Sequence, residues 1–199
     1  MQVWRDRLHR WFAPMAARCP FSPNGISLIA LALNITAAFL LYRQQFLIAI
    51  VVLTIGGLAD AFDGIVARVQ NKASRFGDFL DHFADRVSDV FILTGWLLGS
   101  GVRAEIALLG VIAIMLNGYI GTQLEATWHE RNYETVGRGE FVLALVVFPI
   151  VSHILLSNGW EATTAAGLRV AEWMTLLLVL GALLGIAQRF VLARRLERG

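Results

Sequence analysis

"GLADAFDGIVARVQNKASRFGDFLDHFADRVSDV" (residues 57–90) is the stretch that decides how the rest of the chain is interpreted. It follows and precedes strongly apolar segments, and it contains six aspartates. These are Asp60, Asp63, Asp78, Asp81, Asp85 and Asp89. Charged side chains are costly inside a bilayer, and where they occur they generally mark a functional site. The spacing of these carboxylates therefore decides whether they can form one functional site.

The composition of the chain indicates an integral membrane protein. Hydrophobic residues make up 57% of the 199 residues, charged residues 16%, and the mean hydropathy is +0.62. Soluble globular domains have about 45–50% apolar and about 25% charged residues. The single lysine, Lys72, argues against the lysine-rich face of a nucleic-acid binder. The single cysteine, Cys19, excludes an intrachain disulfide and a cysteine-rich zinc site.

The apolar runs predict an all-α membrane fold with six transmembrane helices. A helix needs about 20 apolar residues to cross a hydrocarbon core of about 30 Å. The predicted spans are 24–43, 46–70, 73–99, 104–128, 139–157 and 168–192. Turn signals such as "SPNG" and "NKAS" separate them. Pro149 is expected to kink the fifth span. We expect one membrane domain over residues 1–199, with its six-helix bundle at 24–192.

Basic residues predict that both termini are cytoplasmic. Loops on the cytoplasmic side of membrane proteins carry an excess of lysine and arginine. The side that would hold both termini carries Arg5, Arg7, Arg10, Arg18, Arg68, Lys72, Arg75, Arg131, Arg138, Arg194, Arg195 and Arg198. The other side carries Arg43, Arg103 and Arg169. This asymmetry indicates a multi-pass protein of the cell membrane, with the aspartate-rich hairpin turned towards the cytoplasm.

Residues 2–17, "QVWRDRLHRWFAPMAA", have the pattern of an interfacial amphipathic helix. They mix tryptophan, phenylalanine and leucine with arginine, as helices that lie on anionic lipid do. Two interpretations stay open. The helix either anchors the protein to the surface, or it also guides a lipid substrate sideways into a site.

The aspartates fall on two helix faces that meet across a turn at Asn71–Lys72. At about 100° per residue, one face of the first helix carries Asp60, Asp63, Gly64 and Ala67. One face of the second helix carries Gly77, Asp81 and Asp85. The two rows lie a similar number of residues from the turn. We therefore expect four carboxylates at one depth, near the cytoplasmic edge of the membrane.

Four carboxylates at one depth in an apolar medium indicate a metal site. Oxygen ligands suit Mg²⁺, and also Mn²⁺, and such a cluster can hold two ions about 4 Å apart. Mg²⁺ usually shares its coordination shell with substrate phosphates, so a phosphate-bearing substrate is implied. Arg68 and Ser74 could bind phosphate oxygens at the membrane edge. Gly64, Ala67 and Gly77 either leave room for that ligand or serve close helix packing.

The motif Asp60-x-x-Asp63-Gly64-x-x-Ala67-Arg68, followed by Gly77-x-x-x-Asp81-x-x-x-Asp85, resembles the signature of the CDP-alcohol phosphotransferase family. The resemblance implies transfer of a substituted phosphate from a CDP-alcohol lipid to an acceptor hydroxyl, with release of CMP. It implies one metal bound by Asp60, Asp63 and Asp81, and a second bound by Asp60, Asp81 and Asp85. Asp85 would also be the general base.

The resemblance also assigns the cytidine diphosphate contacts. They would come from Asn24, Gly25, Ile26, Ser27, Gly64, Ala67, Arg68, Ser74 and Gly77. For Asn24 and Ser27, capping of the first span is an equal alternative. A homodimer is implied as well, and Gly95-x-x-x-Gly99 is a candidate motif for close helix packing.

The acceptor is expected to be inositol phosphate. The pieces "YIGTQ" (119–123) and "VGRGEF" (136–141) resemble the corresponding loop of family members that join inositol phosphate to CDP-archaeol. Phe141 stands where those enzymes tend to carry more charge, so glycerol 3-phosphate and serine stay open as alternatives. Gln123 and Glu125 are candidates for polyol hydroxyls. The candidates for acceptor binding are Lys72, Arg75, Gln123, Arg131 and Arg138. The alternative for Arg131 and Arg138 is a role as positive-inside anchors.

Two other classes of membrane protein also use acidic residues within their helices. An ion-coupled transporter would favour acids near the midplane and an inverted repeat, and neither is found. A prenyl transferase would need aspartate-rich motifs on two distant helices. We expect Asp78 on the helix surface, with support of the metal ligands as the alternative. Asp89 should pair with Arg86 or form a hydrogen bond within the bundle, and His82 should lie on another face than the carboxylates.

Overall fold

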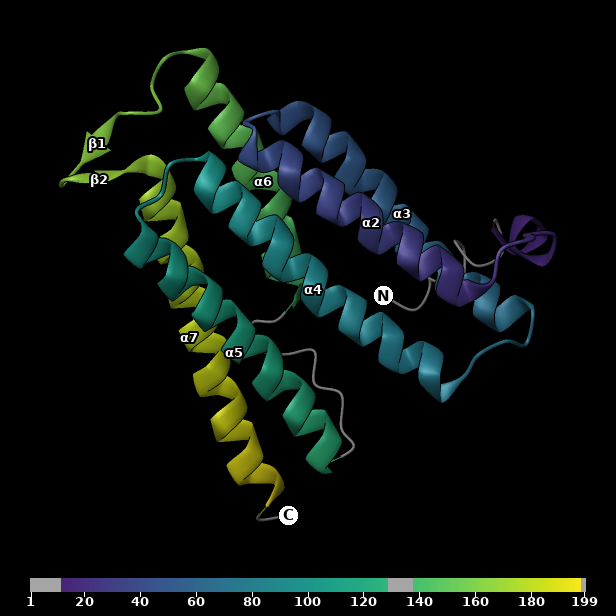
Figure 1. Cartoon of the computed structure of the whole chain (residues 1–199). Coiled ribbons are helices and arrows are strands. Elements are labelled where there is room, and N and C mark those ends of the chain that lie inside the picture. Colours follow the sequence, from purple (N-terminus) through teal and green to yellow (C-terminus); the bar gives the residue numbers. More distant parts are fainter. Residues whose placement is uncertain (1–11, 129–137, 198–199) are drawn as a thin grey trace. The chain divides into compact units, whose positions relative to one another are not determined.

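A computed structural model of the protein describes residues 12–128 and 138–197 (Figure 1). Residues 2–11 of the predicted interfacial helix and the loop with Arg131 lie outside the described residues. Of the predicted segment 2–17, residues 12–17 are helical.

The described residues form six long helices at the positions that the apolar runs predicted. They are α2 (Pro23–Tyr42), α3 (Phe46–Val69), α4 (Arg75–Gly99), α5 (Ala104–Trp128), α6 (Arg138–Ser157) and α7 (Val170–Leu196). Pro149 lies inside α6 with its side chain fully buried. Four of these helices, α2, α3, α5 and α7, are long and apolar enough to cross a membrane. Over the residues that the structure describes, α4 and α6 do not meet both criteria, so six crossings remain a prediction.

A small β-hairpin departs from the all-α prediction. Strand β1 (Thr164–Ala165) pairs antiparallel with β2 (Leu168–Arg169). The two residues between them, Ala166 and Gly167, have φ values of 52° and 76°. Positive φ at both central positions is the geometry of a type I′ turn, which matches the twist of a two-residue hairpin. The last helix therefore begins at Val170, and not at residue 168.

The chain divides into two compact units, which we describe separately. The first comprises Met1–Ala37 and Ile48–Phe91. Its described part holds a hydrophobic cluster of Ala16, Ile26, Ile65 and Val66, which packs the segment before α2 against α3. The Gln70 side chain strengthens this contact, because its Nε2 donates to the carbonyl oxygens of Ala16 and Cys19 at 2.9 Å each.

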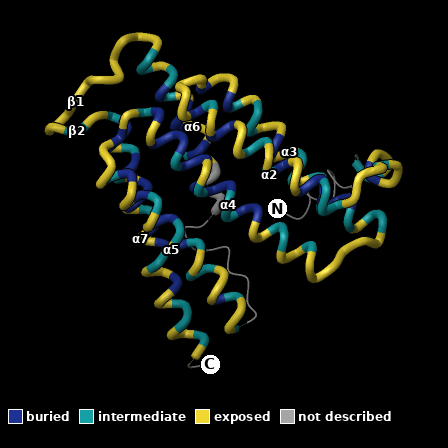
Figure 2. Tube along the Cα trace, in the orientation of Figure 1, coloured by how far each residue is buried: buried dark blue, intermediate teal, exposed yellow. Residues whose placement is uncertain are grey.

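The second unit comprises Ala38–Leu47 and Ile92–Gly199. Its polar core contacts join helices that are distant in sequence. Trp96 Nε1 donates to Ser152 Oγ at 3.0 Å, which joins α4 to α6. The buried Arg189 of α7 donates to both the backbone and the side-chain oxygen of Asn117 on α5. Figure 2 shows exposed residues along the described helices. Large apolar side chains are among the exposed residues of the structure, and Leu143, for example, is 64% exposed. Extensive exposed apolar surface is typical of a protein that contacts membrane lipid.

The Gly95-x-x-x-Gly99 motif is used inside the chain. A Cβ atom at Gly95 would lie 2.2 Å from the carbonyl oxygen of Ala38, and one at Gly99 would lie 2.1 Å from that of Leu41. Contacts this short mean that α4 rests directly on the backbone of α2. The motif therefore gives no support to the predicted homodimer, which remains a prediction.

We expect Gly95→Ala to destabilise the protein, because the added methyl group would meet the Ala38 carbonyl oxygen. Overpacking of this kind costs about 2 kcal/mol, which lowers the midpoint of thermal unfolding by roughly 4–8 °C for a chain of this size. The midpoint is measured by thermal unfolding of each variant in detergent micelles. Gly181→Ala on α7 is the control, because nothing lies within 4 Å of its added Cβ. Equal midpoints for the two variants would contradict the close α2–α4 contact.

Candidate functional site

The turn between α3 and α4 brings the aspartates of the two helices into one place. Helix α3 ends at Val69, and Asn71 adopts a left-handed φ of 52°, which asparagine tolerates better than most residues. The Ser74 Oγ then accepts a hydrogen bond of 3.0 Å from the Gly77 N–H and caps α4. The predicted turn at Asn71–Lys72 is confirmed.

Three of the four predicted carboxylates converge. One oxygen from each of Asp60, Asp63 and Asp81 lies within 4.8 Å of the other two. Asp85 lies one helical turn after Asp81, and these two also approach within 4.8 Å. Asp63 and Asp85 are buried, with 6% and 8% of their surface exposed. The structure thus gathers acidic oxygens from α3 and α4 in the manner that the two helix faces predicted.

Ser27 of α2 is fixed on this cluster. Its hydroxyl lies 2.5 Å from Asp63 Oδ2 and 3.1 Å from the Pro23 carbonyl oxygen. The N-terminus of α2 is capped instead by Ser22, whose Oγ accepts from the Gly25 N–H at 3.1 Å. The structure therefore does not support capping by Ser27, and it shows a contact with Asp63 that neither interpretation included. Contact of Ser27 with cytidine diphosphate stays a prediction.

A pocket of about 220 Å³ opens beside the carboxylates. Ten of the predicted site residues line it: Asn24, Ser27, Asp63, Gly64, Ala67, Arg68, Lys72, Ser74, Gly77 and Asp81. Pro23, Ala73 and Asp78 complete the lining. Small side chains keep this pocket open, since a Cβ at Gly77 would come within 3.2 Å of both Asn24 Oδ1 and Ser74 Oγ.

Several predicted site residues are not among those that line this pocket. The Ile26 side chain is buried in the hydrophobic cluster with Ala16, so it is a core residue. Arg75 is exposed at the start of α4. Gln123 is exposed on α5, in the second compact unit. Arg138 is the first residue of α6, and its side chain, like the whole of Arg131, lies outside the described residues.

His82 is the residue that the spacing argument missed. A ring nitrogen of His82 lies within 4.8 Å of the nearest oxygens of Asp81 and Asp85, so the expectation that it faces away was wrong. The signal was its position three residues before Asp85, a spacing at which helical side chains meet. The Asp89 carboxylate lies 3.4 Å from Arg86, which confirms the predicted pair. Asp78 is exposed and lies 3.9 Å from His82.

The donor set fits a divalent cation. The converging groups are carboxylate oxygens, which Mg²⁺ and Mn²⁺ prefer, and the adjoining pocket leaves space for a second ligand with oxygens of its own. Arg68 contributes a guanidinium to the same lining, which suits a phosphate.

A comparison with protein-family models identifies the chain. Residues 21–187 match the model for CDP-alcohol phosphatidyltransferase. The chain belongs to the CDP-alcohol phosphatidyltransferase family. The match contains every residue of the aspartate signature and both helices that carry it.

Curated relatives in the family cover parts of the chain. The archaetidylinositol phosphate synthase of Pyrococcus horikoshii is 37% identical over 49% of this chain and 52% of its own length. The phosphatidylinositol phosphate synthase of Streptomyces avermitilis is 36% identical over 45% of this chain and 38% of its own. The phosphatidylinositol phosphate synthase of Corynebacterium glutamicum is 31% identical over 68% of this chain and 65% of its own length. The first two alignments thus span about half of those relatives or less.

A solved structure shares the fold of the family. The Mycobacterium tuberculosis phosphatidylinositol phosphate synthase with bound CDP-DAG superposes with a TM-score of 0.71 over 94% of both chains, at 19% identity. The same enzyme in complex with manganese and citrate gives a TM-score of 0.68 over 95% of this chain and 88% of that one, at 18% identity.

We expect Ser27→Ala to weaken binding of Mn²⁺ about tenfold, because loss of a hydrogen bond that orients a metal ligand typically lowers affinity by that amount or more. The free Mn²⁺ signal in electron paramagnetic resonance titrations measures it. Thr36→Ala, also on α2, removes a hydroxyl that is bonded only to its own helix at Ala32 and serves as the control. Unchanged affinity in Ser27→Ala would show that Asp63 is positioned without Ser27.

Proposed function

We propose that the protein transfers the phosphatidyl-type group of a CDP-alcohol lipid to the hydroxyl of a small acceptor, inositol phosphate, and releases CMP. The observation that carries the proposal is the convergence of Asp60, Asp63 and Asp81. Two of these carboxylates, Asp63 and Asp81, line a pocket together with Arg68. Family membership supports the same reaction class.

Asp60, Asp63, Asp81 and Asp85 would hold two divalent ions, Mg²⁺ or Mn²⁺. When bound, these ions would supply charge neutralisation at the donor diphosphate and at the departing CMP. The manganese complex of the Mycobacterium tuberculosis enzyme supports this proposal.

The protein's own residues have separate tasks in this proposal. Arg68 and Ser74 hold the diphosphate, since the Ser74 oxygen already accepts from the Gly77 N–H and its hydroxyl proton stays available to a phosphate oxygen. Gly64, Ala67 and Gly77 leave space for the nucleotide, together with Asn24. Asp85 takes the proton of the acceptor hydroxyl. The freed oxygen then bonds to the β-phosphorus, and the bond from that phosphorus to CMP breaks.

The choice of inositol phosphate rests on the relatives. The names archaetidylinositol phosphate synthase and phosphatidylinositol phosphate synthase recur among proteins similar to this chain. Arg138 and Arg131 are the arginines proposed for the acceptor phosphate, with Lys72 and Arg75 as further candidates and Gln123 for a hydroxyl. We place the site on the cytoplasmic side of the cell membrane, in a homodimer whose subunits each cross the bilayer six times.

We expect Asp85→Asn to abolish CMP release while Mn²⁺ affinity changes by less than about tenfold, because an amide retains one oxygen ligand but cannot accept the hydroxyl proton. Release of CMP from CDP-diacylglycerol in the presence of inositol phosphate measures it. Glu105→Gln, which neutralises an exposed acid on α5, is the control. Turnover at the wild-type rate in Asp85→Asn would remove Asp85 from the general-base role.

We expect Arg138→Ala to raise KM for inositol phosphate about tenfold or more, with little change in KM for the CDP donor. A charge-assisted bond to phosphate contributes about 1.5–3 kcal/mol, which corresponds to that factor. Steady-state CMP release with each substrate varied in turn measures both constants. Arg194→Ala, an exposed arginine near the end of α7, is the control. An equal rise in both constants would argue against an acceptor role.

A panel of acceptors tests the acceptor directly. Inositol phosphate, glycerol 3-phosphate, serine and free inositol are each offered with CDP-diacylglycerol and with CDP-archaeol, and CMP release is scored. We expect release with inositol phosphate. If CMP were released with serine alone, inositol phosphate would not be the acceptor, but the proposed reaction class would still hold.

A further inference from the structure

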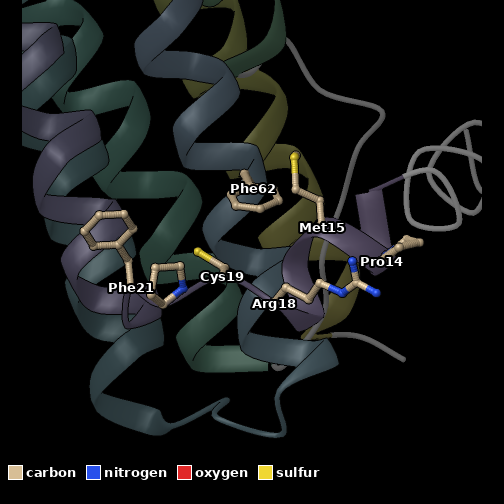
Figure 3. A pocket seen from close by; sticks show the side chains of 7 residues that line it. Pro14, Met15, Arg18, Cys19, Phe21 and Phe62 are labelled. Atoms are coloured by element: carbon tan, nitrogen blue, oxygen red, sulfur yellow. The ribbon is translucent and has the colours of Figure 1, made fainter.

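A second hollow lies on the segment that precedes α2. Pro14, Met15, Arg18, Cys19, Pro20 and Phe21 surround it from the N-terminal segment, and Phe62 of α3 completes it (Figure 3). Its volume is about 570 Å³, which is within the range of small-molecule sites.

This hollow is separate from the carboxylate pocket. The two share no lining residue. On α3, Phe62 is rotated by about 160° from Asp60 and from Gly64, and by about 100° from Asp63. The hollow and the carboxylates therefore face different sides of the same helix.

The walls of the hollow combine apolar surface with one cation. Met15 and Phe21 are 54% and 59% exposed, and Phe62 is half-buried. Arg18 is exposed at the same hollow, and within the described part of the chain its guanidinium makes no ion pair. Figure 3 shows Arg18 and Cys19 side by side below Phe62. A ligand that complements this surface has an anionic group attached to long apolar chains.

The hollow is held in shape by contacts behind it. Ala16 is fully buried against α2 and α3, and Gln70 bonds the carbonyl oxygens of Ala16 and Cys19. The ring of Phe12 packs edge-on against Phe62 at 6.3 Å between centroids. A ligand would thus meet walls that are already ordered, which lowers the entropic cost of binding.

We propose that this hollow binds one anionic phospholipid, separate from the donor lipid. The lipid phosphate pairs with Arg18, and the acyl chains lie over Met15, Phe21 and Phe62. Helix α3 is one of the helices long and apolar enough to cross a membrane, and Phe62 lies two turns from its C-terminal end. The hollow is therefore at the level where headgroups meet acyl chains, which suits a lipid.

Cys19 offers a direct test, because it is the single cysteine of the chain and lies in the hollow. The full-length protein is placed in nanodiscs of phosphatidylcholine alone, or of equal parts phosphatidylcholine and phosphatidylglycerol. The rate of alkylation of Cys19 by a neutral maleimide is then measured. We expect phosphatidylglycerol to slow alkylation several-fold.

The variant Arg18→Gln separates a specific site from a general effect of surface charge. Short-chain phosphatidylglycerol is titrated in detergent, and the concentration that half-protects Cys19 from alkylation is measured. We expect this concentration to be about fivefold higher in the variant, because one arginine near anionic lipid contributes about 1 kcal/mol. Arg195→Gln removes an exposed arginine on α7 and should leave protection unchanged. A double variant, Cys19→Ser with Ser157→Cys, is a further control, because its single cysteine is exposed and lies outside the hollow. Alkylation of this cysteine should not depend on lipid charge.

Three results would overturn the proposal. The first is equal protection by phosphatidylcholine and phosphatidylglycerol. The second is protection that Arg18→Gln and Arg195→Gln reduce alike, which would indicate surface charge alone. The third is protection by inorganic phosphate as strong as that by the lipid, which would indicate an anion site without a lipid. None of these measurements uses CMP release, so their failure is distinct from failure of the proposed reaction.

Discussion

The mutual repulsion of carboxylates at the end of an apolar helix hairpin is the constraint on which this part of the molecule depends. Oxygens of Asp60, Asp63 and Asp81 lie within 4.8 Å of one another, and Asp63 is almost completely buried. Like charges at that separation in a medium of low dielectric need compensation. Ser27 provides one hydrogen bond, at 2.5 Å. The divalent cation proposed for this site would add to that compensation, because oxygen-rich clusters of this kind are what Mg²⁺ and Mn²⁺ prefer.

Small residues serve two different ends in the helices that carry this cluster. Near the turn, Gly64 and Gly77 border the pocket, and the atoms closest to them belong to side chains of residues that also line it. Further along α4, Gly95 and Gly99 meet backbone atoms of α2 directly. Side chains can move aside for a ligand, whereas a backbone contact fixes two helices. The first pair therefore belongs to the site, and the second pair to the scaffold that keeps α4 in place.

The sequence predicted the helices and the aspartate cluster well, because each rests on a local pattern. The length of the apolar runs predicted the positions of all six helices. The spacing of three to four residues between aspartates predicted which helix faces carry the carboxylates. What it missed depends on side-chain reach and on long-range contacts. His82 is one residue past Asp81, yet its ring extends back towards the carboxylates. Ser22 takes the capping role, which frees Ser27 for Asp63. The hairpin before α7 rests on Ala166, whose left-handed conformation no propensity predicts.

The structure also explains why the acceptor segment lacks a charge that the resemblance led us to expect. Phe141 is buried in α6, 8% exposed, and lines an apolar groove with Phe148 and Leu178 of α7. An arginine at this position would place an uncompensated charge among apolar side chains, which costs far more than a surface position does. If the acceptor is phosphorylated, as proposed, position 141 does not supply its cation. Arg138 precedes Phe141 by three residues and begins the helix at its polar end. The packing of α6 on α7 is therefore consistent with the proposal that Arg138, rather than a residue at position 141, supplies the charge for the acceptor.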